Sequence, residues 1–374
     1  MYIRILLFCG LVFLTSCVKT QSQVVSANEN VPDSLVVPAS KPEPQEITIV
    51  FAGDAMQHKA QLESARGRDG KYDYSSYFEA IKPFVESADY AVVNLETTLA
   101  HSDYSGYPMF CSPVAYAEEL IKAGFDLMLT SNNHCLDRRD KGAHRTIAML
   151  DSLGVTHTGT YHDKADRDTL VPKIVDVNGF KIAFLNYTYG TNGIAVQKNL
   201  VVDYINRDKM KADIAKAREQ GAEIVCVCVH WGDEYKLLPN ASQKSLADFL
   251  VGEGVDMVIG GHPHVIQPLQ VRHNPATGKD VLVVYSLGNF ISAMKTTDTK
   301  GGIMVKTRLG RDSLGNARFE SAEYLPVYTL RGTPRGQDFR LVVADSVAQS
   351  KQFLKNAYGI FDKHNVNVPR TREM

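Results

Sequence analysis

Acidic, amide and imidazole side chains stand at five places where an apolar run of this chain ends. The strings are Gly53-Asp54-Ala55-Met56, Asn94-Leu95-Glu96, Asn132-Asn133-His134, His230-Trp231-Gly232 and Gly260-Gly261-His262-Pro263-His264. Carboxylates, amides and histidines together form a donor set for hard to borderline divalent metals. A pair of such ions lowers the pKa of a bound water and neutralises the oxygens of the group under attack. The pattern therefore predicts a dinuclear metal centre that supports hydrolysis or group transfer.

For any single string, the alternative is a strand-end cap or a buried histidine with ordinary partners. Against that alternative, every string follows a short β-rich run, at residues 47–51, 91–93, 127–130, 225–229 and 255–259. Such runs are typical of buried strands. The carboxyl ends of the strands in an open α/β sheet share one edge. We therefore expect the five strings to meet at that edge.

Helical periodicity separates these strands, and further strands follow. The expected helices are residues 57–65, 77–85, 113–124, 141–153, 207–221 and 246–252, with a closing helix at 342–358. The other expected strands are residues 173–177, 181–188, 281–285, 302–308 and 318–330. Helix–strand alternation followed by hairpins predicts a layered α/β fold with mixed sheets.

The N-terminus has the pattern of a targeting segment. Arg4 precedes an apolar stretch at residues 5–14, which is short for a membrane span, and Leu14-Thr15-Ser16-Cys17 resembles a lipobox. We expect residues 1–17 to be a lipoprotein signal peptide with lipidated Cys17, and an ordinary secretory signal is the alternative. Residues 18–46 are expected to be a flexible tether, 47–330 the main domain and 331–374 a C-terminal helical extension. The sequence does not decide which membrane or which face is used.

The charge of the chain excludes one class of partner, and its cysteines are expected in the core. The 374-residue chain has a formal net charge of −1 and no basic cluster with interleaved aromatics, so we expect no nucleic-acid partner. Cys111, Cys135, Cys226 and Cys228 are expected to be buried thiols. On the strand that carries them, Cys226 and Cys228 would share a face with His230.

Six ordered strings resemble the CapA family, named for poly-γ-glutamate capsule synthesis, of the calcineurin-like metallophosphoesterase superfamily. They are GDAM at 53–56, NLE at 94–96, NNHCLD at 132–137, HWGDE at 230–234, GHPH at 261–264 and SLGNF at 286–290. The resemblance covers roughly residues 47–327. It implies a four-layer α/β/β/α sandwich of the metallo-dependent phosphatase type, with the site at the strand ends.

The resemblance also implies a role for each matching residue. Two divalent ions (manganese, iron or zinc) would be held by Asp54 and His264 on one side and by Asn133, His230 and His262 on the other. Glu96 would stand where the superfamily has a bridging Asp. His134 would be the acid or charged group beside the leaving oxygen. Asp137 would orient His134.

Two positions depart from the superfamily pattern. Met56 stands where a histidine ligand is usual, and thioether sulfur is a poor ligand for hard metals. Glu96 is longer than the usual Asp. His58 lies four residues after Asp54 and could replace the missing ligand, and a surface histidine is the alternative.

Residues near the motifs predict the lining of a substrate groove. Tyr189, Asn192, Trp231, Glu234 and Asn289 are the expected substrate-binding residues, and Tyr187 and Tyr235 are expected to join them. An aromatic and hydrogen-bonding lining suits a sugar or polymer at least as well as a small phosphate. For Trp231 and Tyr235 the alternative is core packing.

Together these features predict a lipid-anchored cell-envelope protein. It would be a metal-dependent hydrolase or transferase in the synthesis of capsule, poly-γ-glutamate or another envelope polymer. The expected partners are the polymer or its precursor, a membrane-bound polymer synthase complex and the membrane itself. One alternative is a non-catalytic, metal-containing assembly subunit. Another is a general periplasmic phosphodiesterase, which Met56 disfavours.

Overall fold

The structure, a computed structural model, describes residues 46–101, 103–197, 199–331 and 339–371. The expected signal peptide, Cys17 and the tether up to residue 45 lie outside these ranges. Among the described residues, no helix has the length and apolar character needed to cross a bilayer.

The first sheet has the order β18-β17-β16-β1-β2-β5-β6, and β15 also pairs with β1. Its parallel part joins β1 to β2, β2 to β5, and β5 to β6, while β16, β17 and β18 add antiparallel strands. The strands are β1 (Glu46–Ala55), β2 (Tyr90–Leu95), β5 (Leu127–Leu129), β6 (Thr156–Thr158), β15 (Asn289–Ile291), β16 (Gly301–Arg311), β17 (Ala317–Leu330) and β18 (Arg340–Val343).

The second sheet has the order β13-β14-β12-β11-β9-β8, with β9, β11, β12 and β14 parallel. Its strands are β8 (Lys173–Val177), β9 (Phe180–Thr188), β11 (Ile224–His230), β12 (Met257–Gly261), β13 (Leu269–Asn274) and β14 (Lys279–Val284). Two small pairs lie outside the sheets: β3 (Thr98–Ala100) with β4 (Cys111–Pro113), and β7 (Thr160–Tyr161) with β10 (Val201–Val202).

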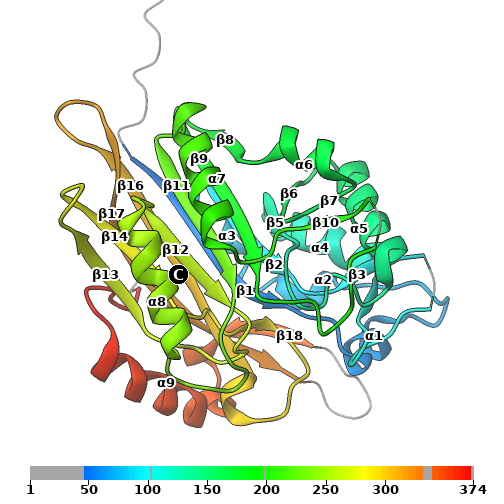
Figure 1. Cartoon of the computed structure of the whole chain (residues 1–374). Helices are drawn as coiled ribbons and strands as arrows, with labels where there is room; N and C mark the ends of the chain where they lie inside the picture. Colours follow the sequence, from blue (N-terminus) through cyan, green and yellow to red (C-terminus); the bar gives the residue numbers. More distant parts are fainter. Residues whose placement is uncertain (1–45, 102, 198, 332–338, 372–374) are drawn as a thin grey trace, which may run out of the picture. The chain divides into compact units, whose positions relative to one another are not determined.

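Three apolar layers hold the two sheets and their helices together. Figure 1 shows how the labelled strands and helices are arranged. Between the sheets, Phe51 and Val92 of the first sheet belong to one core with Phe184 and Cys226 of the second. Side chains alternate along a strand, so Val50 belongs to the outer core instead. This arrangement confirms the predicted α/β/β/α sandwich.

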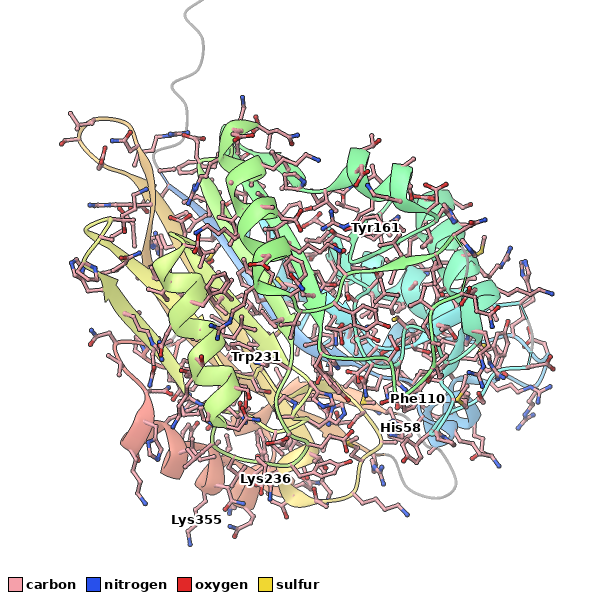
Figure 2. All side chains as sticks on the ribbon, viewed as in Figure 1. His58, Phe110, Tyr161, Trp231, Lys236 and Lys355 are labelled. Atoms are coloured by element: carbon pink, nitrogen blue, oxygen red, sulfur yellow. The ribbon has the colours of Figure 1, made fainter. Side chains whose placement is uncertain are left out.

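Helices cover the outer face of each sheet. The first sheet packs against α2 (Ser75–Phe78), α3 (Lys82–Glu86), α4 (Val114–Lys122) and α5 (Arg139–Leu153). The second packs against α7 (Arg207–Glu219) and α8 (Ala241–Gly252), and Trp231, labelled in Figure 2, belongs to this outer core. The other helices are α1 (Lys59–Ala65), α6 (Lys164–Leu170) and α9 (Lys351–His364).

The closing helix predicted at residues 342–358 is wrong at its start. Residues Arg340–Val343 form β18, where Val343 pairs with Val327 of β17, and the helix α9 begins at Lys351. A short apolar run does not by itself separate strand from helix, and here pairing with β17 decides it. The stretch after residue 330, expected to be helical, therefore also contributes a strand to the first sheet.

Helix α8 begins five residues before its predicted start. The side chain of Asn240 accepts a hydrogen bond from the Gln243 N–H at 2.9 Å, and the Gln243 side chain accepts one from the Asn240 N–H at 3.0 Å. This reciprocal capping box supplies partners for backbone donors at the helix end. It therefore extends the helix to Ala241.

Gly53 allows β1 and β15 to approach each other. A Cβ atom at this position would lie 2.0 Å from the Gly288 carbonyl oxygen, and that oxygen accepts the Asp54 N–H at 3.1 Å. We expect Gly53→Ala to lower the free energy of unfolding by about 2 kcal/mol or more, because the backbone must move to admit the methyl group. Thermal denaturation followed by circular dichroism measures the change.

Gly252→Ala is the matched control. Gly252 ends α8 and a Cβ there would meet nothing within 4 Å. Because Ala is the better helix former, we expect an unchanged or slightly higher melting temperature. Equal melting temperatures for Gly53→Ala and wild type would contradict the close approach of β1 and β15.

Candidate metal centre

Asp54, near the end of β1, lies at the middle of the candidate site and is fully buried. Its Oδ1 accepts a hydrogen bond from Asn94 Nδ2 at 2.8 Å. Its Oδ2 accepts one from the His262 backbone N–H at 3.2 Å and lies 3.2 Å from His264 Nδ1. Residues from β1, β2 and the loop after β12 therefore meet at one carboxylate.

Glu96, directly after β2, is also fully buried and has an oxygen without a partner. Oε2 accepts a long hydrogen bond from Asn94 Nδ2 at 3.3 Å. Oε1 makes no hydrogen bond, and lies 3.7 Å from His230 Nε2 and 3.8 Å from His264 Nε2. Buried polar atoms without partners are rare in folded proteins, and this one faces two imidazoles across the space a cation would need.

The three histidines come from two neighbouring strands. His230 ends β11, and its Nε2 lies 2.8 Å from Asn133 Oδ1. His262 and His264 follow β12 with φ angles of +96° and +57°. Positive φ is costly for residues other than glycine and persists where the surroundings enforce it. Two such residues, both with imidazole side chains, mark this loop as built around the site.

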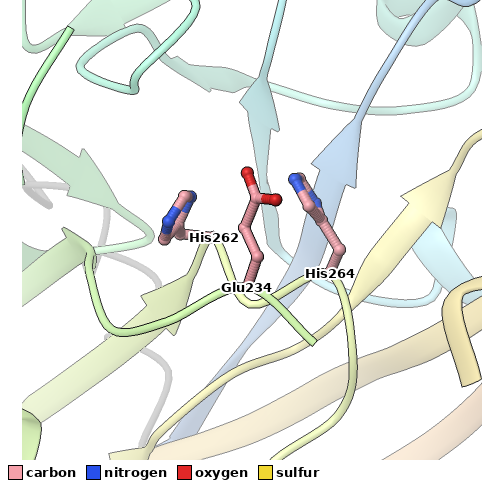
Figure 3. Close-up of side chains that lie close together, drawn as sticks. All are labelled: Glu234, His262 and His264. Atoms are coloured by element: carbon pink, nitrogen blue, oxygen red, sulfur yellow. The ribbon is translucent and has the colours of Figure 1, made fainter. Parts of the chain in front are cut away.

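The donor atoms fit a metal centre. Atoms of Asp54, Glu96 and His264 all lie within 4.8 Å of one another, and so do those of Glu234, His262 and His264. Figure 3 shows the Glu234 carboxylate between the His262 and His264 rings. The unpartnered atoms Glu96 Oε1 and His262 Nδ1 belong to these two groups. Carboxylates with imidazoles suit manganese, iron or zinc, in agreement with the expected cofactor class.

Burial and neighbouring charges set the protonation of these groups. Burial, together with the charge of Asp54, raises the pKa of Glu96 well above its usual value of 4.5. Burial alone would raise the pKa of Asp54 too, but the hydrogen bond and charge of His264 lower it. Burial lowers the pKa of His230 well below its usual value and that of His262 to about 3. These two imidazoles are therefore neutral near pH 7, which is the form that binds a metal.

His134 and Asp137 form a buried pair beside this cluster, as the family resemblance implies. His134 Nδ1 lies 2.7 Å from Asp137 Oδ2, which also accepts the Phe110 N–H at 2.6 Å. The Phe110 and His134 rings contact each other in a T-shaped arrangement, with centroids 4.6 Å apart. The Asn132 side chain accepts the His134 N–H at 3.1 Å. His134 is thus held by a hydrogen bond at its ring nitrogen, by the ring contact with Phe110 and by its backbone N–H.

Met56 and His58 are the two positions in question for a first-metal ligand, and both make contacts in the structure. Met56 is buried, and its carbonyl accepts hydrogen bonds from Gln61 Nε2 at 3.0 Å and the Tyr116 hydroxyl at 3.1 Å. His58 Nδ1 accepts the Ala293 N–H at 3.3 Å, and its ring packs on Phe110 at 5.0 Å. His58 is not in either group of candidate ligands among the described residues. Its role as a replacement ligand stays a prediction.

Two of the expected substrate-binding residues lie at the opening of the site. Tyr189 is 47 % exposed, and its ring lies 4.5 Å from that of His262 and 6.5 Å from that of His230. The Asn192 side-chain oxygen accepts a hydrogen bond from Asn133 Nδ2 at 3.2 Å.

Four other residues expected in the groove lie differently. Tyr187 is buried and donates to Asp213 of α7 at 2.7 Å, because its neighbour Asn186 takes the other face of β9. Trp231 is a core residue whose Nε1–H donates to the Tyr285 carbonyl at 2.8 Å, although its ring also lines a pocket. Asn289 is fully buried, with Oδ1 3.1 Å from His264 Nδ1, so it positions that histidine. Glu234 joins a ligand group, as described above.

Comparison with known protein families identifies the family of this chain. The family described as bacterial capsule synthesis protein PGA_cap matches residues 48–294, which carry every candidate ligand named above. The chain belongs to this capsule synthesis family.

Two curated relatives extend the match. The chain is 28 % identical over 311 residues to the capsule biosynthesis protein CapA of Bacillus anthracis, covering 80 % of this chain and 72 % of that one. It is 26 % identical over 279 residues to the PGA biosynthesis protein CapA of Bacillus subtilis strain 168, covering 72 % of this chain and 69 % of that one.

The Haemophilus influenzae NAD nucleotidase NadN shares the fold, with a TM-score of 0.50 and 14 % identity; 86 % of this chain aligns with 57 % of that chain. The fold of this family member is thus of the calcineurin-like metallophosphoesterase type.

Within this family member, two amides have contacts that the sequence did not assign. Asn94 Nδ2 contacts both buried carboxylates and lies 3.5 Å from His230 Nδ1, and its Oδ1 accepts Asn132 Nδ2 at 3.1 Å. Asn132 also donates to the Leu95 carbonyl at 2.9 Å. Both amides stand inside the strings that carry the candidate ligands, and that position was their only signal.

Replacing Glu96 distinguishes two effects of this residue: the loss of stability that its burial causes in the metal-free protein, and its contribution to metal binding. A carboxyl whose pKa is raised on folding contributes stability below its usual pKa of 4.5 and loses that contribution as the pH rises toward the raised value. We therefore expect chelator-treated Glu96→Gln to melt at a higher temperature than chelator-treated wild type at pH 8, with a smaller difference at pH 5. The same variant should bind manganese or zinc at least about tenfold more weakly. Calorimetric melting and metal titration measure the two effects.

His262→Ala is the companion variant. It removes a neutral imidazole and leaves both buried carboxylates, so it should lose metal without the gain in metal-free stability. If elemental analysis finds no metal in wild type after reconstitution with manganese, iron or zinc, the metal-centre prediction fails.

Proposed function

We propose that this protein is a metal-dependent hydrolase or transferase that acts on a cell-envelope polymer or its precursor during capsule or poly-γ-glutamate synthesis. The observation that carries the proposal is the buried His134–Asp137 pair beside the candidate ligands. A centre that only stabilised the fold would need the ligands but no oriented imidazole next to them. The family match supports the polymer as the setting of the reaction.

The ligand groups would divide the work of holding two divalent ions. Asp54, Glu96 and His264 form one group, and His262 belongs to the other with Glu234 and His264. His230 and Asn133 lie against each other at 2.8 Å and complete the predicted set. Ions held here would supply an activated water and neutralise charge on the group under attack.

His134 is the proposed acid. Its Nδ1 faces the Asp137 carboxylate at 2.7 Å, which leaves Nε2 as the atom that delivers a proton to the leaving oxygen. Asp137 fixes the ring orientation and is itself held by the Phe110 N–H. Tyr189 covers His230 and His262 at the opening and limits the access of water to them.

The second candidate function is a non-catalytic assembly subunit that keeps a metal for structure. One observation favours it: Met56 leaves the first ligand position without a hard donor, and His58 is hydrogen-bonded elsewhere. Under this alternative, the site would stabilise a surface that binds polymer or a membrane-bound synthase.

Location and partners form part of the proposal. We infer that lipidated Cys17 anchors the domain at the cell envelope, where it would meet the polymer and a polymer synthase complex. The relatives' names place them in capsule and PGA biosynthesis, which supports this setting.

His134→Ala tests the catalytic role. It should retain both metals and lower turnover about 10²–10⁴-fold, the usual contribution of a general acid. Asp137→Asn should lose less, because it disturbs only the orientation of the ring. Turnover of a chromogenic phosphoester, metal content and melting temperature are measured on the same samples. If His134→Ala leaves turnover unchanged, His134 is not the acid; if the wild type shows no turnover and His134→Ala leaves capsule production in cells unchanged, the non-catalytic alternative is correct.

Cys17→Ser tests the anchor. The variant should not incorporate a fatty-acid analogue and should leave the membrane fraction, or keep its signal peptide. Metabolic labelling followed by fractionation measures both. Wild-type protein that never takes up the label would refute lipidation.

A further inference from the structure

A pocket of about 550 Å³ lies next to the candidate metal centre. Its walls come from Tyr189, Trp231 and Gly232 on one side and from the first turns of α7 and α8 on the other. This volume falls in the range of pockets that bind small ligands. Trp231 is labelled in Figure 2, and packs with residues of α8 in the outer core.

Arg207, the first residue of α7, is held in this pocket by neutral groups. Its Nη2 donates to Ser245 Oγ of α8 at 2.7 Å, and its guanidinium lies 5.2 Å from the centroid of the Phe249 ring. Among the described residues, no acidic side chain forms an ion pair with Arg207. A guanidinium has five N–H donors, so most remain for a ligand, and the two contacts have already reduced its freedom.

The charge of the pocket matches one carboxylate. Arg207 is the one charged residue among the described residues that line it. The first turn of α8, which includes Ser242, faces the same space. A planar guanidinium pairs with a planar carboxylate through two parallel hydrogen bonds. A phosphate monoester, with nearly two negative charges, would be only partly neutralised here.

Two residues connect the pocket to the candidate ligands. Tyr189 lines the pocket, and its ring contacts the His262 ring. Gly232 lines it as well, and lies two residues before Glu234 of the second ligand group. An extended substrate could therefore place one unit at the ligands and the next in the pocket.

We propose that this pocket is a subsite for the carboxylate of the substrate unit next to the reacting group, anchored by Arg207. The inference rests on the proposed function, since it takes the substrate to be a polymer or precursor with repeated acidic units. It gives a role to the one charged residue that lines this pocket, next to a centre whose candidate ligands include Glu234, His262 and His264.

Trp231 makes binding directly measurable, because it is the single tryptophan of the chain and lines the pocket. The probes are a γ-linked glutamate oligomer, the same oligomer with its carboxylates amidated, and a uronic-acid oligomer. We expect fluorescence titration of the full-length protein to show binding of a carboxylate oligomer and at least tenfold weaker binding of the amidated one. The two carboxylate probes distinguish a peptide polymer from an acidic polysaccharide as the source.

Arg207→Gln should weaken that binding about 10–100-fold, which corresponds to the loss of a charge-assisted hydrogen bond. Arg207→Lys should recover only part of it, because it keeps the charge without the planar fork. The matched control is Lys244→Gln, which removes one positive charge from α8 where it faces a different pocket, and should change binding less than twofold. Melting temperatures confirm that the exposed Arg207 position tolerates replacement.

The subsite is overturned if no carboxylate oligomer binds, if the amidated oligomer binds equally well, or if Arg207→Gln and Lys244→Gln behave alike. These outcomes are independent of the proposed reaction. Arg207-dependent binding without any turnover would refute the reaction and leave the subsite. Turnover that depends on His134, with binding insensitive to Arg207, would refute the subsite alone.

Discussion

The burial of two carboxylates at one point is the constraint on which the rest of the site depends. Asp54 and Glu96 are both fully buried, and each would be costly there without compensation. The Asp54 carboxylate is compensated by its contacts with Asn94, the His262 N–H and His264. Glu96 keeps an oxygen without a partner and a raised pKa. The protein thus stabilises the Asp54 carboxylate by its own groups and leaves one oxygen of Glu96 without such a partner, where a cation would compensate for its burial.

The sandwich brings the compensating groups to this point from both sheets. The first sheet contributes Asp54 and Glu96, and the second contributes His230 and the loop that carries His262 and His264. Close backbone approach is a condition for this, since a Cβ on Gly261 would lie 2.9 Å from Asp54 Oδ1. The positive φ values of His262 and His264 are a second condition. The local strain is sustained because the loop is held by contacts to both sheets.

The sequence predicted the layered fold and the meeting of its polar strings, because strand ends in an α/β sheet share an edge. The His134–Asp137 pair was expected from the resemblance to the CapA family. The sequence did not predict which way side chains face at or just beyond the end of a strand. Tyr187 packs under α7, and Asn289 supports His264, although both stood near motif strings. Arg207 gave no signal, because its importance comes from the empty space beside it, which no local pattern encodes. Strand β18 was not predicted for a related reason, because its conformation depends on pairing with β17, which is not adjacent in the local sequence pattern.

The contact between Asp54 and His264 joins residues 210 positions apart, and it has a consequence for how the protein is made. During synthesis, the first carboxylate leaves the ribosome long before the last imidazole exists. A partly made chain therefore exposes acidic and imidazole groups that cannot yet form a closed coordination sphere. Contacts of such long range also slow folding, since the chain must close a large loop before they form. Any metal held by these residues would therefore bind only once the domain is nearly complete, because a truncated chain ending before β12 would lack His262 and His264.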